Sequence, residues 1–196
     1  MLSSPVFRGV GLVLAGLVLA GCQCKNEYTW DAELPPDSFE NDHGQWLSMD
    51  ISPTGDLAVT YYDRSQGAVG FALGERVDGY PDSEGLNPGN RGEFTSMKVA
   101  PDGRVWVAYH DVANGSLRAA VRDGGEWSSD VADVGGGLSP RAGMWASLDL
   151  DADGNPVVAH YDSEKGNLRV ARYDGEPGSG ALDQEGKTVS DTEAKS

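Results

Sequence analysis

The sequence predicts an all-β protein built from three antiparallel sheets, and three observations support this prediction. A core segment occurs three times without a gap, at residues 48–63, 96–111 and 147–162. Each copy has alternating apolar and polar residues followed by an apolar run, which is the pattern of two successive strands. The chain contains 27 glycines and 10 prolines, and no segment keeps the periodicity of an amphipathic helix. A period of about fifty residues indicates stacked repeat units.

The first strand of each unit is expected to have one apolar face. Its apolar positions alternate with polar ones and are Met49, Ile51, Met97, Val99, Leu148 and Leu150. A short turn that ends in glycine follows each strand, at Gly55, Gly103 and Gly154. Glycine at this place supplies the positive φ of a tight hairpin. The pattern therefore predicts that each unit opens with a β-hairpin.

The second strand of each unit is expected to be buried on both faces. Residues 57–62, 105–110 and 157–161 are apolar or aromatic at nearly every position. An Asp-x-x-x-Gly turn follows each of them, and its candidate structural residues are Asp63, Gly67, Asp111, Gly115, Asp162 and Gly166. A third strand comes next, at 69–73, 117–121 and 168–172. A fourth strand is marked only in the second unit, at 126–131.

Four antiparallel strands with a doubly buried middle describe one blade of a β-propeller. The units resemble bacterial β-propeller repeats of the form Ser-Leu-x-x-Asp-x-x-Gly-x-x-x-x-x-Tyr-Tyr-Asp over residues 46–176. The resemblance implies a propeller-like domain at 46–180, with blades at about 46–93, 94–144 and 145–180. A β-sandwich is the alternative fold.

Three blades are fewer than the four to eight of typical propellers. An incomplete ring exposes the apolar faces of its two end blades to water. Three explanations remain open at this point: a shortened or truncated relative of a longer propeller, closure by self-association through the open faces, or coverage by the end segments. We expect the mature chain to be oligomeric or poorly soluble.

The N-terminus has the features of an export signal. Residues 1–8 carry one positive charge and no acid, and residues 10–20 form an apolar run. Eleven residues are too few for a membrane-spanning helix, which needs about 20, so residues 1–21 are predicted to be a signal peptide. The tetrad Leu19-Ala20-Gly21-Cys22 resembles the lipobox of bacterial lipoproteins. An ordinary signal peptide with a chance cysteine is the alternative.

The lipobox resemblance implies that lipid such as palmitate is attached to Cys22 and anchors the chain in a membrane. It places the protein at the cell envelope, in the outer membrane or at the cell surface. Residues 22–45 would then form a lipidated tether, and residues 181–196 are a polar tail. Cys24 would be the remaining thiol, so no internal disulfide is expected. The net charge of −16 disfavours nucleic acids as partners.

The residues that resemble metal ligands or catalytic groups are better explained as turn-forming or packing residues. Asp149, Asp151 and Asp153 resemble the start of a calcium loop, but His160 occupies the place of its essential glutamate. His110 and His160 fall in columns that otherwise hold tyrosine, which favours packing. The sequence therefore predicts no metal site, no cofactor and no catalytic residue.

The predicted function is a non-catalytic binding or scaffold domain for an unknown protein or glycan ligand. Long links between the units place candidate ligand-facing residues at Tyr80, Asp82, Glu84 and Arg141. Sialidases are also exported propellers, and their repeats carry Ser-x-Asp-x-Gly-x-Thr-Trp, which no segment of this chain matches. A remnant of a sialidase-like carbohydrate-active enzyme is the alternative function.

Overall fold

The computed structural model describes residues 43–82, 90–135, 141–173 and 187–188. All of them belong to one compact unit, Leu34–Ser196, and a second unit, Met1–Glu33, lies outside the described residues. The predicted signal peptide, Cys22, Cys24 and nearly all of the tether and tail also lie outside them. No helix in the described part of the chain is long and apolar enough to cross a membrane.

The described residues form three antiparallel sheets of four strands, in each of which neighbouring strands follow one another along the chain. The first sheet contains β1 (His43–Ile51), β2 (Leu57–Asp63), β3 (Ala68–Leu73) and β4 (Arg76–Val77). The second contains β5 (Arg91–Val99), β6 (Val105–Asp111), β7 (Ser116–Asp123) and β8 (Glu126–Asp133). The third contains β9 (Met144–Leu150), β10 (Pro156–Asp162), β11 (Asn167–Arg172) and β12 (Lys187–Thr188). The predicted all-β fold class is confirmed for these residues.

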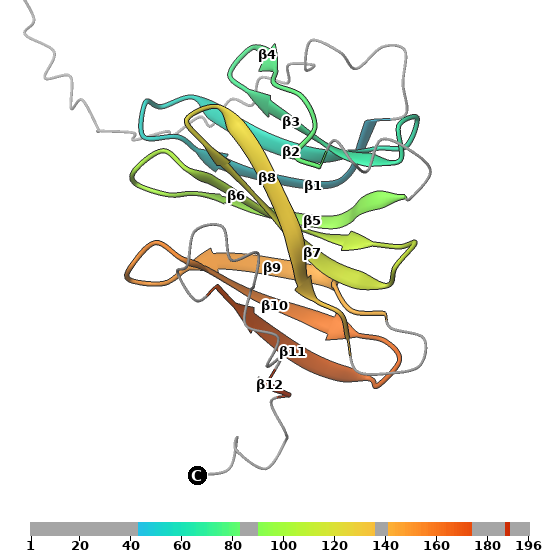
Figure 1. Ribbon diagram of the computed structural model, residues 1–196. Helices are drawn as coiled ribbons and strands as arrows, with labels where there is room; N and C mark the ends of the chain where they lie inside the picture. The colour runs from blue at the N-terminus through green and yellow to red at the C-terminus, as the bar shows by residue number, and fades with distance from the viewer. Residues whose placement is uncertain (1–42, 83–89, 136–140, 174–186, 189–196) are drawn as a thin grey trace, which may run out of the picture. The chain divides into compact units, whose positions relative to one another are not determined.

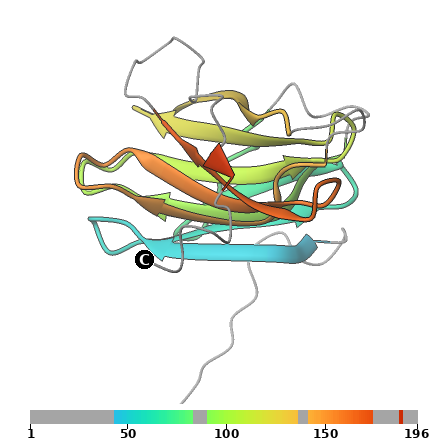
Figure 2. The ribbon, with the colours of Figure 1, turned by 90° about the horizontal axis from the view of Figure 1, so that it is seen from below.

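The three sheets are stacked face to face, with the second sheet in the middle (Figure 1). Seen from below in Figure 2, the strands of the third sheet run in a similar direction to those of the second. The first strands are joined across the stack by side-chain hydrogen bonds. The Met97 N–H donates to Ser48 Oγ at 3.0 Å, and the Leu148 N–H donates to Ser96 Oγ at 2.9 Å. The small serines thus join adjacent sheets where their first strands meet.

Two apolar clusters fill the spaces between the sheets. Val69 and Phe71 of the first sheet pack with Met97 and Val107 of the second. The second cluster joins the second and third sheets and includes Trp106, Leu117, Leu148 and Val158. Strand β6 lies between the clusters and is buried at every position. This explains why its sequence is apolar almost throughout.

The first strand of every sheet contains an irregularity that the alternation of residues did not predict. The pairing register of β1, β5 and β9 with its neighbour shifts near the start of the strand. Trp46, Phe94 and Trp145 lie at these shifts with φ of 48°, 56° and 48°, values that L residues rarely adopt. Their rings form a row in which successive centroids are 5.1 Å apart. The row connects the three sheets beside their first strands.

The sheets do not close into a ring within the described residues. Leu47, Met49 and Ile51 are 63%, 63% and 54% exposed on the outer face of the first sheet. Leu168 is 50% exposed on the third sheet. The structure therefore shows a stack of three sheets with apolar side chains at both ends.

Candidate functional site

The recurring aspartates at the ends of the second strands organise turns. Asp63 Oδ1 accepts the N–H groups of Ser65 and Gln66 at 2.9 and 3.1 Å. Asp111 and Asp162 accept turn N–H groups in the same way. The glycines that close these turns, Gly67, Gly115 and Gly166, have φ of 62°, 62° and 70°. Each aspartate thus satisfies backbone donors that a tight turn would leave unpaired.

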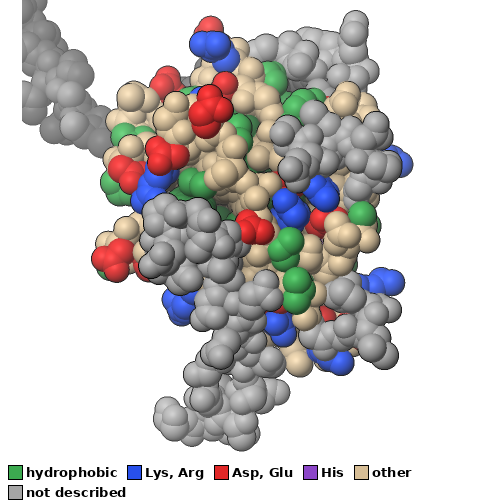
Figure 3. Space-filling model, viewed as in Figure 1, with side chains coloured by type: hydrophobic (Ala, Val, Ile, Leu, Met, Phe, Trp, Pro, Cys, Tyr) green, Lys and Arg blue, Asp and Glu red, His purple; other side chains and the backbone are tan. Residues whose placement is uncertain are grey.

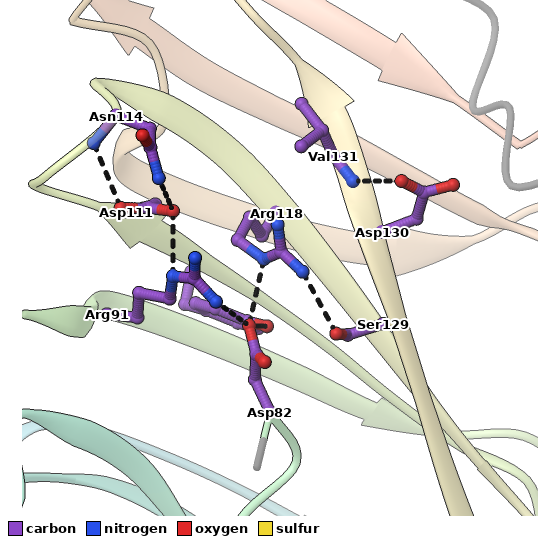
Figure 4. Close-up of polar contacts among 9 residues, drawn as sticks. Asp82, Arg91, Asp111, Asn114, Arg118, Ser129, Asp130 and Val131 are labelled. Carbon is purple, nitrogen blue, oxygen red and sulfur yellow. Dashed lines mark hydrogen bonds and ion pairs between the residues drawn. The ribbon is translucent and has the colours of Figure 1, made fainter. Parts of the chain in front are cut away.

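A buried ion pair crosses each junction between sheets. Asp82, in the link after the first sheet, lies 2.9 Å from Nε of Arg118 on β7 (Figure 4). Asp133, at the end of β8, lies 2.6 Å from Nε of Arg169 on β11. Both carboxylates are 2% exposed. Because the same arrangement occurs at both junctions, we infer that the ion pairs hold each sheet against the next.

Asp82 therefore lies inside the molecule, although the sequence placed it in a candidate ligand-facing loop. The same Asp82 Oδ2 accepts the hydroxyl of Tyr109 at 2.8 Å and lies 3.4 Å from Nη1 of Arg91. Arg91 also pairs with Asp111 at 3.0 Å, so the charges form a connected network (Figure 4). Burial and the neighbouring Asp82 raise the pKa of Tyr109 far above its usual value, so its hydroxyl remains a donor.

Asp133 occupies the corresponding place at the second junction. Burial alone would raise its pKa, but hydrogen bonds from His160, Arg169 and the Gly135 N–H hold the pKa of Asp133 far below its usual range. The Nε2 atom of His160 lies 3.2 Å from Asp133 Oδ2. His160 thus takes the place that Tyr109 has beside Asp82.

The two histidines hold one peptide group between them. Nδ1 of His110 lies 2.6 Å from the carbonyl oxygen of Ala142, and the N–H of Gly143 donates to Nδ1 of His160 at 2.9 Å. Burial lowers the pKa of His110, although its hydrogen bond with Ala142 opposes the shift. Both imidazoles bind the link that leads into the third sheet, which agrees with the packing role expected for these two columns.

A pocket of about 450 Å³ opens between the second and third sheets beside His110. This volume falls within the usual range of small-ligand sites, about 300 to 1,000 Å³. Its lining combines one carboxylate, one imidazole, one guanidinium and one amide with apolar side chains. The lining residues are Glu93, His110, Val112, Ala113, Asn114, Gly115, Arg141 and Met144.

The pocket lies where the repeat departs from its own pattern. At the junction between the first and second sheets, Tyr62 occupies the place of His110 and Asn90 occupies the place of Arg141. The Tyr62 hydroxyl donates to the Asn90 side chain, so two polar groups of the first junction satisfy each other. At the second junction the smaller imidazole faces Ala142 instead. At the second junction His110 replaces the larger tyrosine and Arg141 replaces the asparagine that would bind it. These two replacements account for a pocket lined by an exposed arginine.

The aromatic row continues from the pocket. The ring of Phe94 is 6.2 Å from that of His110 and 5.1 Å from that of Trp145. Trp145 is 62% exposed, which is unusual for a large aromatic side chain. The pocket is thus bordered by an aromatic surface that a ligand extending out of it can contact.

Of the other three candidate ligand-facing residues, the structure describes two. The hydroxyl of Tyr80 donates to Asp63 Oδ2 at 2.8 Å, and Glu84 lies outside the described residues. Arg141 is exposed and lines the pocket. Glu93 and Asn114 join it there and were not identified from the sequence. The signal that could have found them is the column-by-column departure from the repeat.

The acidic turn of the third sheet behaves as a hairpin. Asp151 Oδ1 accepts the N–H groups of Asp153 and Asn155, both at 2.9 Å. Throughout the described ranges, no group of three or more His, Cys, Asp or Glu side chains is placed to hold a metal ion. On the face seen in Figure 3, acidic and basic side chains are interspersed and apolar ones form small groups.

The chain is similar to solved structures but matches no protein family. No family model and no curated protein matches the chain. The chain is similar to a fucose lectin from Kordia zhangzhouensis solved in complex with methyl-fucoside, with 13% identity, a TM-score of 0.39, and coverage of 66% of this chain and 93% of the lectin.

A second similar structure is an exo-β-1,3-galactanase from Clostridium thermocellum, with 16% identity and a TM-score of 0.44. The match covers 66% of this chain and 34% of the galactanase, so the chain spans about a third of that enzyme. At these TM-scores the two structures do not identify a ligand for this chain.

Proposed function

We propose that the chain is an exported, lipid-anchored protein whose three sheets are propeller-type blades forming a non-catalytic binding domain. Its ligand is a neutral saccharide that enters the pocket between the second and third sheets. The observation that carries the proposal is the break in the repeat at this pocket. A structural residue is needed at every junction, whereas a binding residue is needed once.

The lining of the pocket suits a sugar. The carboxylate of Glu93 can accept hydrogen bonds from a ligand and the guanidinium of Arg141 can donate them, while Val112 and Met144 supply apolar surface. A sugar ring has hydroxyl groups around its edge and C–H groups on its faces, so it needs both kinds of contact. Among the described residues, the Arg141 guanidinium has no hydrogen-bond or ion-pair partner, and it is available to a ligand. The net charge of −16 makes a polyanionic ligand unfavourable.

The envelope location rests on the N-terminal sequence. A signal followed by Leu-Ala-Gly-Cys22 supports lipid attachment at that cysteine. Residues 23–42 would then separate the lipid from the first strand of the binding domain. Release of the chain from membranes by a Cys22→Ser substitution, followed by fractionation, tests this part of the proposal.

The enzyme alternative would need a cluster of accessible arginines to bind a substrate carboxylate. Arg91 and Arg118 are instead paired with Asp82 inside the first junction. The equivalent pair, Asp133 and Arg169, occurs at the second junction, so the arrangement is repeated and structural. Release of sialic acid from a sialyl oligosaccharide by the purified chain would support the enzyme instead.

The binding proposal predicts that an array of neutral mono- and oligosaccharides contains a ligand whose affinity depends on Arg141. In calorimetric titrations with the best array ligand, Arg141→Ala should weaken binding about tenfold or more, because it removes a hydrogen bond to a charged donor. Arg172→Ala is the matched control, since Arg172 is an exposed arginine at the other end of β11 from the pocket. Equal effects of the two substitutions, or no array ligand at all, would contradict the proposal.

A further inference from the structure

The outer face of the first sheet repeats a surface that is buried at both internal junctions. Met97 on β5 and Leu148 on β9 point toward the preceding sheet and are 2% and 4% exposed. Met49 holds the same place on β1 and is 63% exposed, because no described sheet precedes it. The first sheet therefore presents one half of a junction without its partner.

The outer face of the third sheet presents the other half. Val69 on β3 and Leu117 on β7 face the following sheet and are 1% and 0% exposed. Leu168 holds the same place on β11 and is 50% exposed. Ser147 matches Ser48 and Ser96, which accept N–H groups of the following sheet, and Ser147 is exposed. The two ends of the stack are thus complementary to each other.

We propose that two copies of the chain pack head to tail, with the first sheet of each on the third sheet of the other. Such a contact joins two different surfaces, and because each copy uses both of its ends, the pair is closed and does not extend into a filament. Two copies supply six sheets, which falls within the four to eight blades of closed propellers. The inference rests on the propeller arrangement proposed above and is independent of the ligand pocket.

The junction between copies lacks the ion pair of the internal junctions. Gly70 occupies the position that corresponds to Arg118 and Arg169, so the first sheet offers no guanidinium to its partner. Two chains that each carry a net charge of −16 also repel each other. We therefore expect an association that depends on apolar contact and becomes stronger when salt screens the repulsion.

Sedimentation velocity of the full chain in a density-matched detergent tests the proposal. The wild-type protein should sediment with twice the mass of a single copy at a concentration of about 100 μM. The dimer fraction should increase between about 0.1 M and about 1 M salt. Met49→Asp and Leu168→Asp should each abolish the dimer, because each places a charge in one half of the contact.

Val134→Asp is the matched control, because Val134 is 48% exposed and directly follows β8 of the middle sheet, away from both end sheets' outer faces. It should leave the dimer intact, and circular dichroism should show the same β-sheet spectrum for all variants. A wild-type chain that remains monomeric in high salt overturns the proposal, as expected if the chain's own residues outside the structure cover the two faces. Loss of the dimer in Met49→Asp but not in Leu168→Asp also overturns it, since that result indicates pairing of two first sheets.

Discussion

At the scale of single residues, the buried charges are arranged in pairs that serve the junctions. Removing one member of a buried ion pair leaves the other without compensation, which is more costly than removing an exposed charge. Asp133 is almost fully buried and is bound by Arg169 through two contacts, at 2.6 and 2.9 Å. Substitution of Arg169 should therefore destabilise the protein more than substitution of Arg172, an exposed arginine on the same strand.

Arg169→Met should lower the free energy of unfolding by about 3 kcal/mol, because it leaves the Asp133 carboxylate buried without its guanidinium partner. Arg172→Met, on the same strand, should change it by less than about 0.5 kcal/mol. Urea denaturation followed by tryptophan fluorescence measures both values. Similar losses in the two variants would show that Arg169 does not stabilise the junction.

His110 should make stability depend on pH. Its pKa is lowered in the folded protein from the ordinary value of 6.5, mainly by burial. The unfolded chain therefore binds the proton more readily, and the free energy of unfolding should decrease as the pH falls below about 6.5. The lowered pKa of Asp133 acts at more acidic pH, below about 4, where its carboxylate begins to protonate in the unfolded chain.

His110→Tyr provides the test of this pH dependence, because tyrosine is the residue of the same column at positions 62 and 161. The variant should have a shallower change of unfolding free energy between pH 7 and 5 than the wild type, measured by urea titration at each pH. Equal slopes would indicate that His110 does not titrate differently in the folded and unfolded states. The larger ring should also reduce saccharide binding, since it occupies the pocket.

At the scale of strands and links, close backbone approach sets where glycine is required. Gly92 and Gly143 lie at corresponding places near the starts of the second and third sheets, with φ of 129° and 94°. A Cβ atom on Gly92 would lie 2.4 Å from the backbone nitrogen of Val69, and one on Gly143 would lie 2.9 Å from Cα of Leu117. At the starts of the second and third sheets the backbone therefore passes the third strand of the preceding sheet too closely for any side chain.

Gly92→Ala should destabilise the protein by more than about 3 kcal/mol, because steric overlap adds to the strain of a positive φ. Gly55→Ala is the matched control, since Gly55 also has positive φ but its added Cβ would meet nothing within 4 Å. The control should cost only about 1 to 2 kcal/mol of backbone strain. Thermal unfolding of both variants would contradict the packing argument if their midpoints shifted equally.

The sequence predicted the strands better than the links between them. The alternation at Met49 and Met97 and the glycine turns are local signals, and they located the hairpins correctly. The positive φ of Trp46, Phe94 and Trp145 has no local signal, because bulky residues rarely adopt it. Their recurrence in one column was visible, but its conformational meaning depended on contacts between sheets.

At the scale of the whole domain, the candidate site could be predicted only in part. Arg141 was identified from its long link, whereas Asp82 in the other link is buried in an ion pair. Loop length alone does not distinguish these cases, because a charged residue in a link can turn inward when the next sheet supplies its counterion. Asp82 has such partners in Arg91 and Arg118, which come later in the chain. Comparing the two junctions residue by residue distinguishes repeated structural positions from candidate binding positions.

The walls of the pocket come from both sides of one junction, so ligand binding is coupled to the docking of the two sheets. Glu93 and His110 come from the second sheet, while Arg141 and Met144 come from the link and strand that begin the third. An occupant that contacts both walls binds only while the two sheets remain docked, so part of its binding free energy opposes their separation. Occupancy of the pocket would then be linked to the mechanical stability of the domain, and the second and third sheets of an unliganded protein would separate under a lower force.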